Sequence, residues 1–182
     1  MKTTRFLLPF MHGVDKFAIE QAILLAKSHH ATLIPLVLIH VPEGCRKTGV
    51  RLEYMQQSMD FLETVKHKAY WHSVQIERLE VFTSDIVQSI NLVASEMECE
   101  GVLLLINQKG GVLLQVDQIK SIIEMPPCKI YIIHLPAVQS KSFVQAVRSS
   151  ISRLFSGGNV RQGDRMQDQE YLVEEAELPT KA

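Results

Sequence analysis

Four polar residues that could bind a small anion lie near the ends of short apolar runs. His12 follows the first run, His40 lies near the end of the second, and Asn107 and Lys109 lie at the end of the fourth. In a parallel sheet covered by helices, ligands bind at the carboxyl ends of the strands. These side chains could therefore converge on a pocket for a small anion or polar metabolite, with Lys109 as the counter-charge. They could equally be loop residues and a satisfied core histidine.

Gly110 and Gly111 follow this last group and allow two interpretations. Glycine lets a phosphate approach the backbone closely, so the pair could form an anion-binding loop together with Lys109. The pair could also form a tight turn between a strand and a helix. The sequence leaves both interpretations open.

The other histidines indicate no catalytic or metal centre. His29 and His30 lie at a predicted helix end, where a protonated imidazole complements the helix dipole. His67 and His72 lie about one helical turn apart without an acidic or cysteine partner, which argues against a zinc site. The chain has no nucleophile-elbow motif and no Walker loop. We therefore predict that the protein is not an enzyme and carries no metal.

The composition is that of one folded domain without a strong charge bias. Of the 182 residues, 46% are hydrophobic, and 19 basic residues against 20 acidic ones give a net charge of -1. This balance provides no chain-wide attraction to nucleic acid, so we expect no nucleic-acid partner. No segment approaches the roughly 20 apolar residues that span a bilayer, and the first apolar run is too short for a signal peptide.

The three cysteines are Cys45, Cys99 and Cys128, which are widely spaced and form no CxxC pair. Such spacing suggests neither a disulfide framework nor a zinc knuckle. Cys99 and Cys128 border apolar runs, and we predict that they behave as small buried hydrophobes. A reducing compartment fits these features, and we expect a cytoplasmic location.

Short apolar runs alternate with segments of helical periodicity, an arrangement typical of a parallel sheet covered by helices. We expect Asp15 to cap the first helix, and Ser84 or Asp85 to cap the third. The third run alternates apolar and polar residues and therefore suits an edge strand. Right-handed crossovers make this order an α/β fold with a doubly wound, five-stranded parallel sheet. The expected strands are residues 5–11, 32–41, 74–82, 101–107 and 129–135.

Over residues 5–136 the chain resembles the universal stress protein family. The family's first strand, first helix and second strand resemble residues 5–41. Its fourth strand and phosphate loop resemble GVLLLINQKGG, and the opening of its last strand resembles MPPCKIYIIHL. The resemblance implies a Rossmann-like sheet with the strand order 3-2-1-4-5.

The residues that mark ATP-binding members of this family are mostly replaced. Those members have an Asp at the end of the first strand and a glycine loop of the form G-2x-G-9x-G-S/T. Met11 takes the place of the Asp, and Asn107 takes the place of the first Gly. Gly110 matches the second Gly, but the closing Gly-Ser falls on Val116 and Asp117, whose carboxylate would repel a phosphate. We therefore predict that ATP or AMP binding is lost and that no cofactor is bound.

Two functions are consistent with these features. The first is a non-enzymatic regulatory or stress-response domain of universal stress protein type, which acts by dimerisation and partner recruitment. The second is a sensor that binds a nucleotide or small metabolite at the carboxyl ends of the first and fourth strands. The candidate remnant pocket comprises Met11, His12, His40, Asn107, Lys109, Gly110 and Gly111.

The run Lys129–Leu135 would form an edge strand in the family's strand order, and it is apolar on both faces. An exposed edge of this kind invites pairing with another strand. The family often dimerises through this strand, so the resemblance implies a homodimer through Lys129–Leu135. Alternatively, a helix from the following segment could fold back and cover the edge.

The composition changes after Pro136, so we expect the α/β domain to comprise residues 1–137. Residues 138–158 contain a predicted cationic amphipathic helix, Lys141–Phe155, with its apolar residues on one face. This helix could pack on the domain, lie on an anionic membrane or bind a partner protein. Residues 159–182 are rich in acidic residues and are predicted to be disordered.

Overall fold

A computed structural model describes residues 4–41, 52–108, 110–136 and 173–176 of the chain. The chain divides into two units, one of Met1–Leu135 with Leu172–Ala182 and the other of Pro136–Tyr171. Nearly all of the second unit lies outside the described residues. It includes the predicted helix Lys141–Phe155. The fold and the site described below belong to the first unit.

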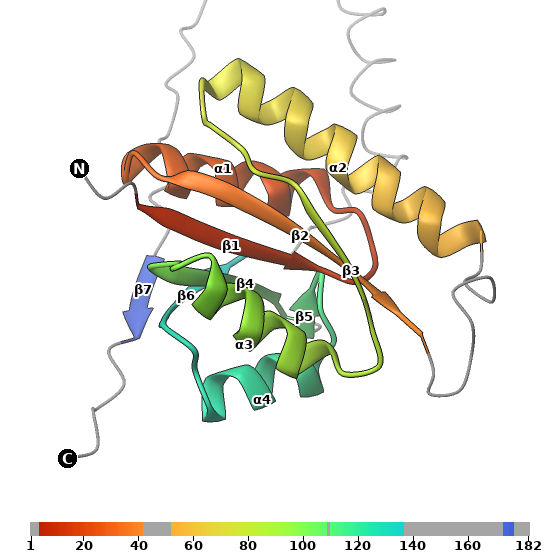
Figure 1. Cartoon of the computed structure of the whole chain (residues 1–182). Helices are drawn as coiled ribbons and strands as arrows, with labels where there is room; N and C mark the ends of the chain where they lie inside the picture. Colours follow the sequence, from red (N-terminus) through yellow and green to blue (C-terminus); the bar gives the residue numbers. More distant parts are fainter. Residues whose placement is uncertain (1–3, 42–51, 109, 137–172, 177–182) are drawn as a thin grey trace, which may run out of the picture. The chain divides into compact units, whose positions relative to one another are not determined.

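A twisted sheet forms the centre of this unit, and its five long strands are parallel (Figure 1). Their order is β3-β2-β1-β4-β6, which confirms the predicted order 3-2-1-4-5 because β6 is the fifth of these strands. Two short strands pair antiparallel with this sheet, β5 with β4 and β7 with β6. The strands are β1 (Arg5–Phe10), β2 (Thr32–His40), β3 (Leu79–Thr83), β4 (Gly101–Asn107), β5 (Gly110–Val112), β6 (Lys129–His134) and β7 (Val173–Ala176).

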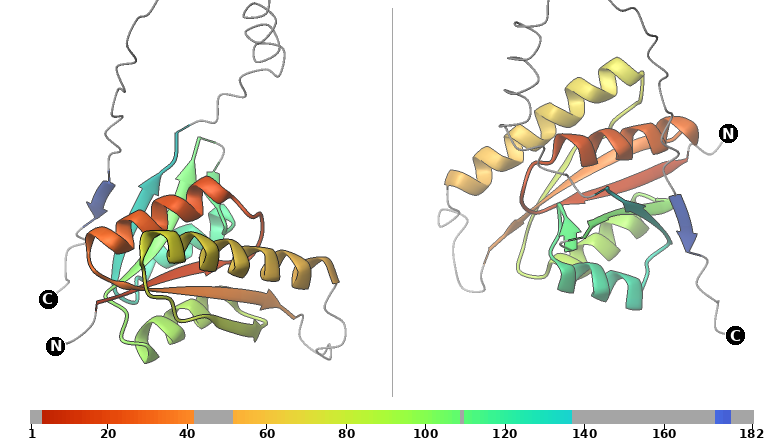
Figure 2. Two further views of the ribbon diagram at one scale, coloured as in Figure 1. Left: turned by 90° about the horizontal axis from the view of Figure 1, so that it is seen from above. Right: turned by 180° about the vertical axis from the view of Figure 1, so that it is seen from behind.

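Helices cover both faces of the sheet. α1 (Lys16–Ser28) and α2 (Leu52–His72) pack on one face, and α3 (Ile86–Glu96) and α4 (Val116–Glu124) lie on the other (Figure 2). This layering is the doubly wound arrangement expected from the alternation of strands and helices.

The alternation of side chains along the strands produces one apolar core on each side of the sheet. Along β1, Phe6, Leu8 and Phe10 belong to the core under α1 and α2, whereas Leu7 belongs to the core under α3 and α4. The rings of Phe10 and Phe61 stack with their centroids 4.1 Å apart. Because β1 is buried on both faces, its sequence is a continuous apolar run.

Two helices begin at the predicted capping residues. Asp15 Oδ1 accepts the backbone N–H groups of Phe17 and Ala18, both at 2.9 Å. Asp85 Oδ1 accepts the N–H of Gln88 at 2.9 Å. These bonds satisfy N–H groups that have no partner within the first turn of a helix.

The third strand is shorter than predicted. β3 begins at Leu79, and Ile76 forms only an isolated bridge with Leu33 of β2. The backbone N–H of Glu77 still donates to the carbonyl of Leu33 at 3.0 Å, and its side chain forms an ion pair with Arg5 at 3.5 Å. The prediction that this strand lies at an edge of the sheet is confirmed.

A strand lies within the acidic segment 159–182, for which the composition predicts disorder. Residues Val173–Ala176 form β7, which pairs with residues 130–133 of β6. Low hydrophobicity and a run of acidic residues predict disorder from local composition alone. Pairing with the unoccupied edge of a sheet is a non-local interaction, which such composition does not reveal.

Candidate functional site

The carboxyl ends of β1 and β4 flank a small cavity of about 300 Å³. The strand order changes direction between these two strands, and doubly wound proteins bind ligands at this place. Of the predicted site residues, His12, Asn107 and Gly111 line the cavity. Its full lining is His12, Gly13, Val14, Asp15, Asn107, Gly111, Val112 and Leu113.

The two glycines at this site form a tight hairpin. Asn107 of β4 pairs with Gly110 of β5, and Ile106 pairs with Gly111, so the chain reverses within two residues. Gly110 has a φ of +127°, which favours glycine. A Cβ atom on Gly111 would collide with the carbonyl oxygen of Leu114 and with neighbouring side-chain atoms. The two glycines therefore belong to a tight turn, as one interpretation predicts, but this turn joins two strands rather than a strand and a helix.

After the hairpin, the chain folds back over the end of β1. The carbonyl oxygen of Leu113 accepts the backbone N–H of Met11 at 2.8 Å and that of His12 at 3.4 Å. Leu113 has a φ of +72°, an uncommon conformation for a leucine. These N–H groups at the end of β1 are therefore bonded within the chain and are not available to a phosphate.

Gln118 connects the first turn of α4 to the end of β1. Its Nε2 donates to the sulfur of Met11 at 3.0 Å, and its Oε1 accepts the backbone N–H of Gln115 at 3.0 Å. Met11 also packs against the apolar core under α3 and α4. The sequence prediction did not include Gln118, although its spacing from Gln115 is that of a helix capping box.

Among the described residues, the cavity wall carries one carboxylate, which is unfavourable to an anion. Asp15 lines the cavity, and its carboxylate caps α1. Asp117 adds a carboxylate in the first turn of α4. The predicted counter-charge, Lys109, lies outside the described residues.

His40 does not join the cavity. It ends β2, is exposed, and pairs with Thr83 of β3. The last pair between β1 and β2 joins Phe10 to Val37, so β2 extends three residues beyond β1. Gly110 lies in the hairpin, and the side chain of Met11 is held by Gln118, so neither is part of the cavity lining.

His12 contributes a side chain with an unmet hydrogen-bonding capacity. Its Nε2 atom is buried and has no hydrogen-bond partner among the described residues. Because His12 lines the cavity, this nitrogen could donate to or accept from a small polar molecule. Over the same part of the chain, no group of three or more His, Cys, Asp or Glu residues could hold a metal ion.

Proteins similar to this chain are found by structure but not by sequence. No protein-family model matches the sequence, and no curated protein sequence shows significant similarity to it. A universal stress protein family structure from Burkholderia pseudomallei matches with a TM-score of 0.54 and 14% identity, over 72% of this chain and 96% of that chain. The chain has the universal stress protein fold.

Two further universal stress protein structures agree. The protein from Archaeoglobus fulgidus in complex with dAMP matches with a TM-score of 0.53 and 12% identity, over 71% of this chain and 97% of that chain. UspA from Lactobacillus plantarum matches with a TM-score of 0.52 and 14% identity, over 74% of this chain and 99% of that chain. At these identities the similarity establishes the universal stress protein fold, and the site must be judged from its own residues.

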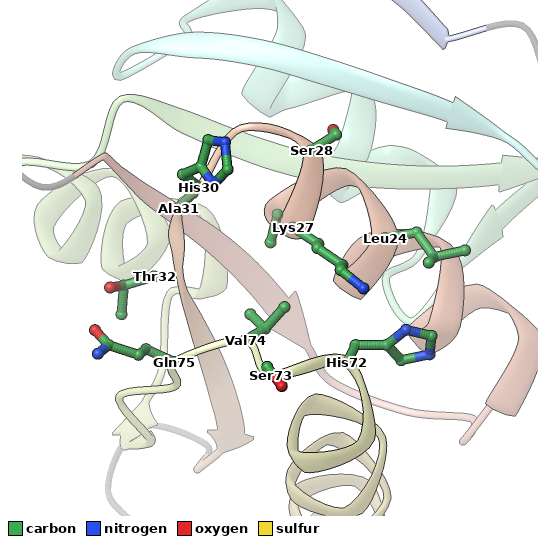
Figure 3. A pocket seen from close by; sticks show the side chains of 11 residues that line it. Leu24, Lys27, Ser28, His30, Ala31, Thr32, His72, Ser73, Val74 and Gln75 are labelled. Carbon is green, nitrogen blue, oxygen red and sulfur yellow. The ribbon is translucent and has the colours of Figure 1, made fainter.

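A larger hollow lies at the opposite end of this universal stress protein fold. It has a volume of about 740 Å³ and is lined by residues from the end of α1, the start of β2 and the segment after α2 (Figure 3). Lys27 and His30 near the end of α1, and His72 at the end of α2, contribute basic side chains to its lining (Figure 3). Two helix carboxyl termini meet here, and their dipoles oppose the binding of an anion.

The cysteines have the predicted character of small buried hydrophobes. Cys99 is buried and Cys128 is half-buried, and both are free thiols in the apolar core under α3 and α4. Burial raises the pKa of each thiol to about 11, and the neighbouring Cys99 adds to the effect at Cys128. Neither thiol is therefore activated as a nucleophile. Among the described residues, no helix is long and apolar enough to cross a membrane.

Proposed function

We propose that the protein is a non-enzymatic, universal stress protein-like regulatory domain whose nucleotide site is closed. It acts in the cytoplasm through association with other protein chains rather than through ATP or AMP. The observation that carries the proposal is the pair of hydrogen bonds from Met11 and His12 to the carbonyl of Leu113. They occupy backbone groups at the position where the fold would otherwise receive a ligand.

A nucleotide would have to disrupt several contacts before it could enter. The bond between Gln118 and the sulfur of Met11 would break, and the β4–β5 hairpin would have to move away from β1. The phosphates would then lie close to the carboxylate of Asp15, which lines the cavity. The cavity of about 300 Å³ is also at the lower limit of the usual ligand pockets, which span roughly 300–1,000 Å³.

Calorimetric titration of the full chain with ATP, AMP and dAMP tests this proposal. We expect no saturable heat at ligand concentrations up to the millimolar range. The Archaeoglobus fulgidus protein, whose structure contains dAMP, serves as the positive control under the same conditions. Micromolar binding of any of the three nucleotides to this chain would overturn the proposal.

One observation favours a second function, a sensor of a small polar metabolite. The buried and unpartnered Nε2 of His12 belongs to a residue of the cavity wall, where Asn107 and Gly111 also lie. A ligand much smaller than a nucleotide could fit the cavity without opening the hairpin, and a rotation of the His12 ring would bring this nitrogen to it. A shift of the His12 ring signals in NMR spectra on titration with a small neutral polar molecule such as acetamide would support this function, and unchanged signals would count against it.

We further propose that association uses the edge strand β6 and that the segment Lys141–Phe155 recruits a partner. Support for the first part comes from the apolar character of β6, since Ile130, Tyr131 and Ile133 are all buried. Support for the second part is the amphipathic sequence of the segment, which lies outside the described residues. Sedimentation of the full chain with and without residues 137–182 measures self-association at the β6 edge.

A further inference from the structure

The outer edge of β6 is covered by a strand of the same chain. β7 runs antiparallel to β6, and its four residues Val173–Ala176 pair with residues 130–133 (Figure 1). On its other side, β6 pairs with β4 along its whole length. β7 therefore occupies the edge that an incoming strand would otherwise meet.

The β6 edge requires a cover more than the opposite edge of the sheet does. Residues Ile130–Ile133 carry no charge, and three of the four are buried. The opposite edge strand, β3, alternates half-buried and exposed residues and presents the charged Glu80. Charges on an edge strand oppose pairing with another chain, whereas an uncharged apolar edge invites it.

The direction of the backbone N–H groups along β6 shows which of them can bond to β7. The N–H of Leu135 donates to the carbonyl of Ile106 in β4. Because N–H groups alternate in direction along a strand, those of Ile130 and Ile132 point away from β4 and toward β7. Ile132 lies opposite Glu174, so these two residues form a hydrogen-bonded pair of the antiparallel ladder.

A second copy of the chain could use the same groups. Two β6 strands related by a twofold axis are necessarily antiparallel, as β7 and β6 are. A β6–β6 pair would need the N–H and C=O groups of Ile130 and Ile132, which β7 already occupies. The two arrangements therefore exclude each other.

We propose that β7 is a built-in competitor that keeps the chain monomeric and that its release exposes β6 for pairing with β6 of a second copy. This inference rests on the proposed association through β6. β7 is a weak strand, since two of its four residues are glutamates, which are depleted in strands. It competes because it belongs to the same chain, so its pairing with β6 does not depend on protein concentration, whereas β6–β6 pairing does.

Two proline variants of β7 provide a matched test. Glu174→Pro removes an N–H that the ladder directs toward β6, whereas Glu175→Pro removes one that points away. Light scattering coupled to size-exclusion chromatography measures the molar mass of each full-length form at about 100 μM. We expect the unmodified chain and Glu175→Pro at the monomer mass of 20.6 kDa, and Glu174→Pro at twice that mass.

A second substitution tests whether the dimer forms through β6. Ile132→Lys places a charge on the half-buried outer residue of β6, and we expect it to return the Glu174→Pro form to a monomer. If Glu174→Pro stays monomeric, or if both proline variants behave alike, the competition proposal is wrong. If the unmodified chain is already a dimer and Ile132→Lys dissociates it, association through β6 stands but the role of β7 does not. Circular dichroism confirms that each variant is folded.

Discussion

The two ends of the sheet differ in the volume of the cavity that lies beside them. At the carboxyl end, Leu113 and Gln118 bond to the end of β1, and the cavity beside them has a volume of about 300 Å³. At the amino end, a hollow of about 740 Å³ separates the ends of α1 and α2 (Figure 3). The larger space lies where the topology directs no ligand. The bonding state of strand-end groups is therefore a better guide to function here than the volume of a cavity.

The largest expected effect concerns the hairpin that closes the carboxyl end. A Cβ atom on Gly111 would meet Ile119 Cδ1 at 2.6 Å as well as the backbone of Leu114. We expect Gly111→Ala to lower the free energy of unfolding by about 2–3 kcal/mol, because overpacking a tight contact forces the backbone to move. Urea denaturation measures the change.

Gly13→Ala serves as the control for this substitution at the same cavity. Gly13 has a φ of +72°, but a Cβ atom added there would meet no atom within 4 Å. The cost of this substitution is limited to the left-handed conformation, about 1 kcal/mol. Equal losses for the two variants would mean that the hairpin is not the tightly packed closure described above.

The second prediction concerns the thiols near the amino ends of β4 and β6. With the pKa of each raised from 9.0 to about 11, the thiolate fraction of Cys99 and Cys128 near pH 8 falls about 100-fold. Alkylation by iodoacetamide in the folded protein should slow by a comparable factor relative to the urea-unfolded chain. Peptide mass spectrometry measures labelling at each cysteine. Equal rates in the folded and unfolded states would show that the two thiols are accessible to solvent rather than buried.

The same pKa values set the pH dependence of stability. The folded state holds these protons more tightly than the unfolded state, so the contribution is complete below pH 9 and is lost as the pH rises toward 11. Melting temperatures measured from pH 8 to 11 should therefore fall. Cys99→Ala should reduce the slope of that fall, and an unchanged slope would contradict the assignment to Cys99.

The third prediction compares a glutamine at each end. Gln118→Ala removes the bonds to Gln115 and Met11, and we expect a loss of about 1 kcal/mol, as for a helix cap. Gln75 lines the hollow at the amino end and is exposed, so Gln75→Ala should change stability by less than about 0.5 kcal/mol. Thermal denaturation measures the stability of both variants. Similar losses would contradict the conclusion that the two ends of the sheet differ in packing.

Most of the fold could be predicted because its signals are local. The strands that are buried on both faces are continuous apolar runs, and Asp15 and Asp85 identify helix starts by residue type. β7 could not be predicted in this way, because four residues of an acidic segment acquire their structure only by pairing with β6. Local composition contains no information on that partner.

The position of the cavity between β1 and β4 could be predicted from topology, but the contacts that surround it could not. From the sequence alone, Gly110 and Gly111 could form either an anion-binding loop or a tight turn. The choice depends on Leu114 and Ile119, which fill the space beside Gly111. Gln118 carried a local capping signal, but its contact with Met11 joins residues 107 positions apart. Such contacts are visible only once the strands are assembled.

The smallest expected effect concerns His12, which lines the closed end. Its buried Nε2 has no partner within the described part of the chain, so its desolvation is uncompensated. We expect His12→Leu to leave stability unchanged or to raise it by up to about 1 kcal/mol, opposite in sign to Gln118→Ala. Urea denaturation of both variants at the same pH makes the comparison. A loss above about 1 kcal/mol would mean that a bound water or small molecule satisfies this nitrogen, contrary to the uncompensated desolvation described here.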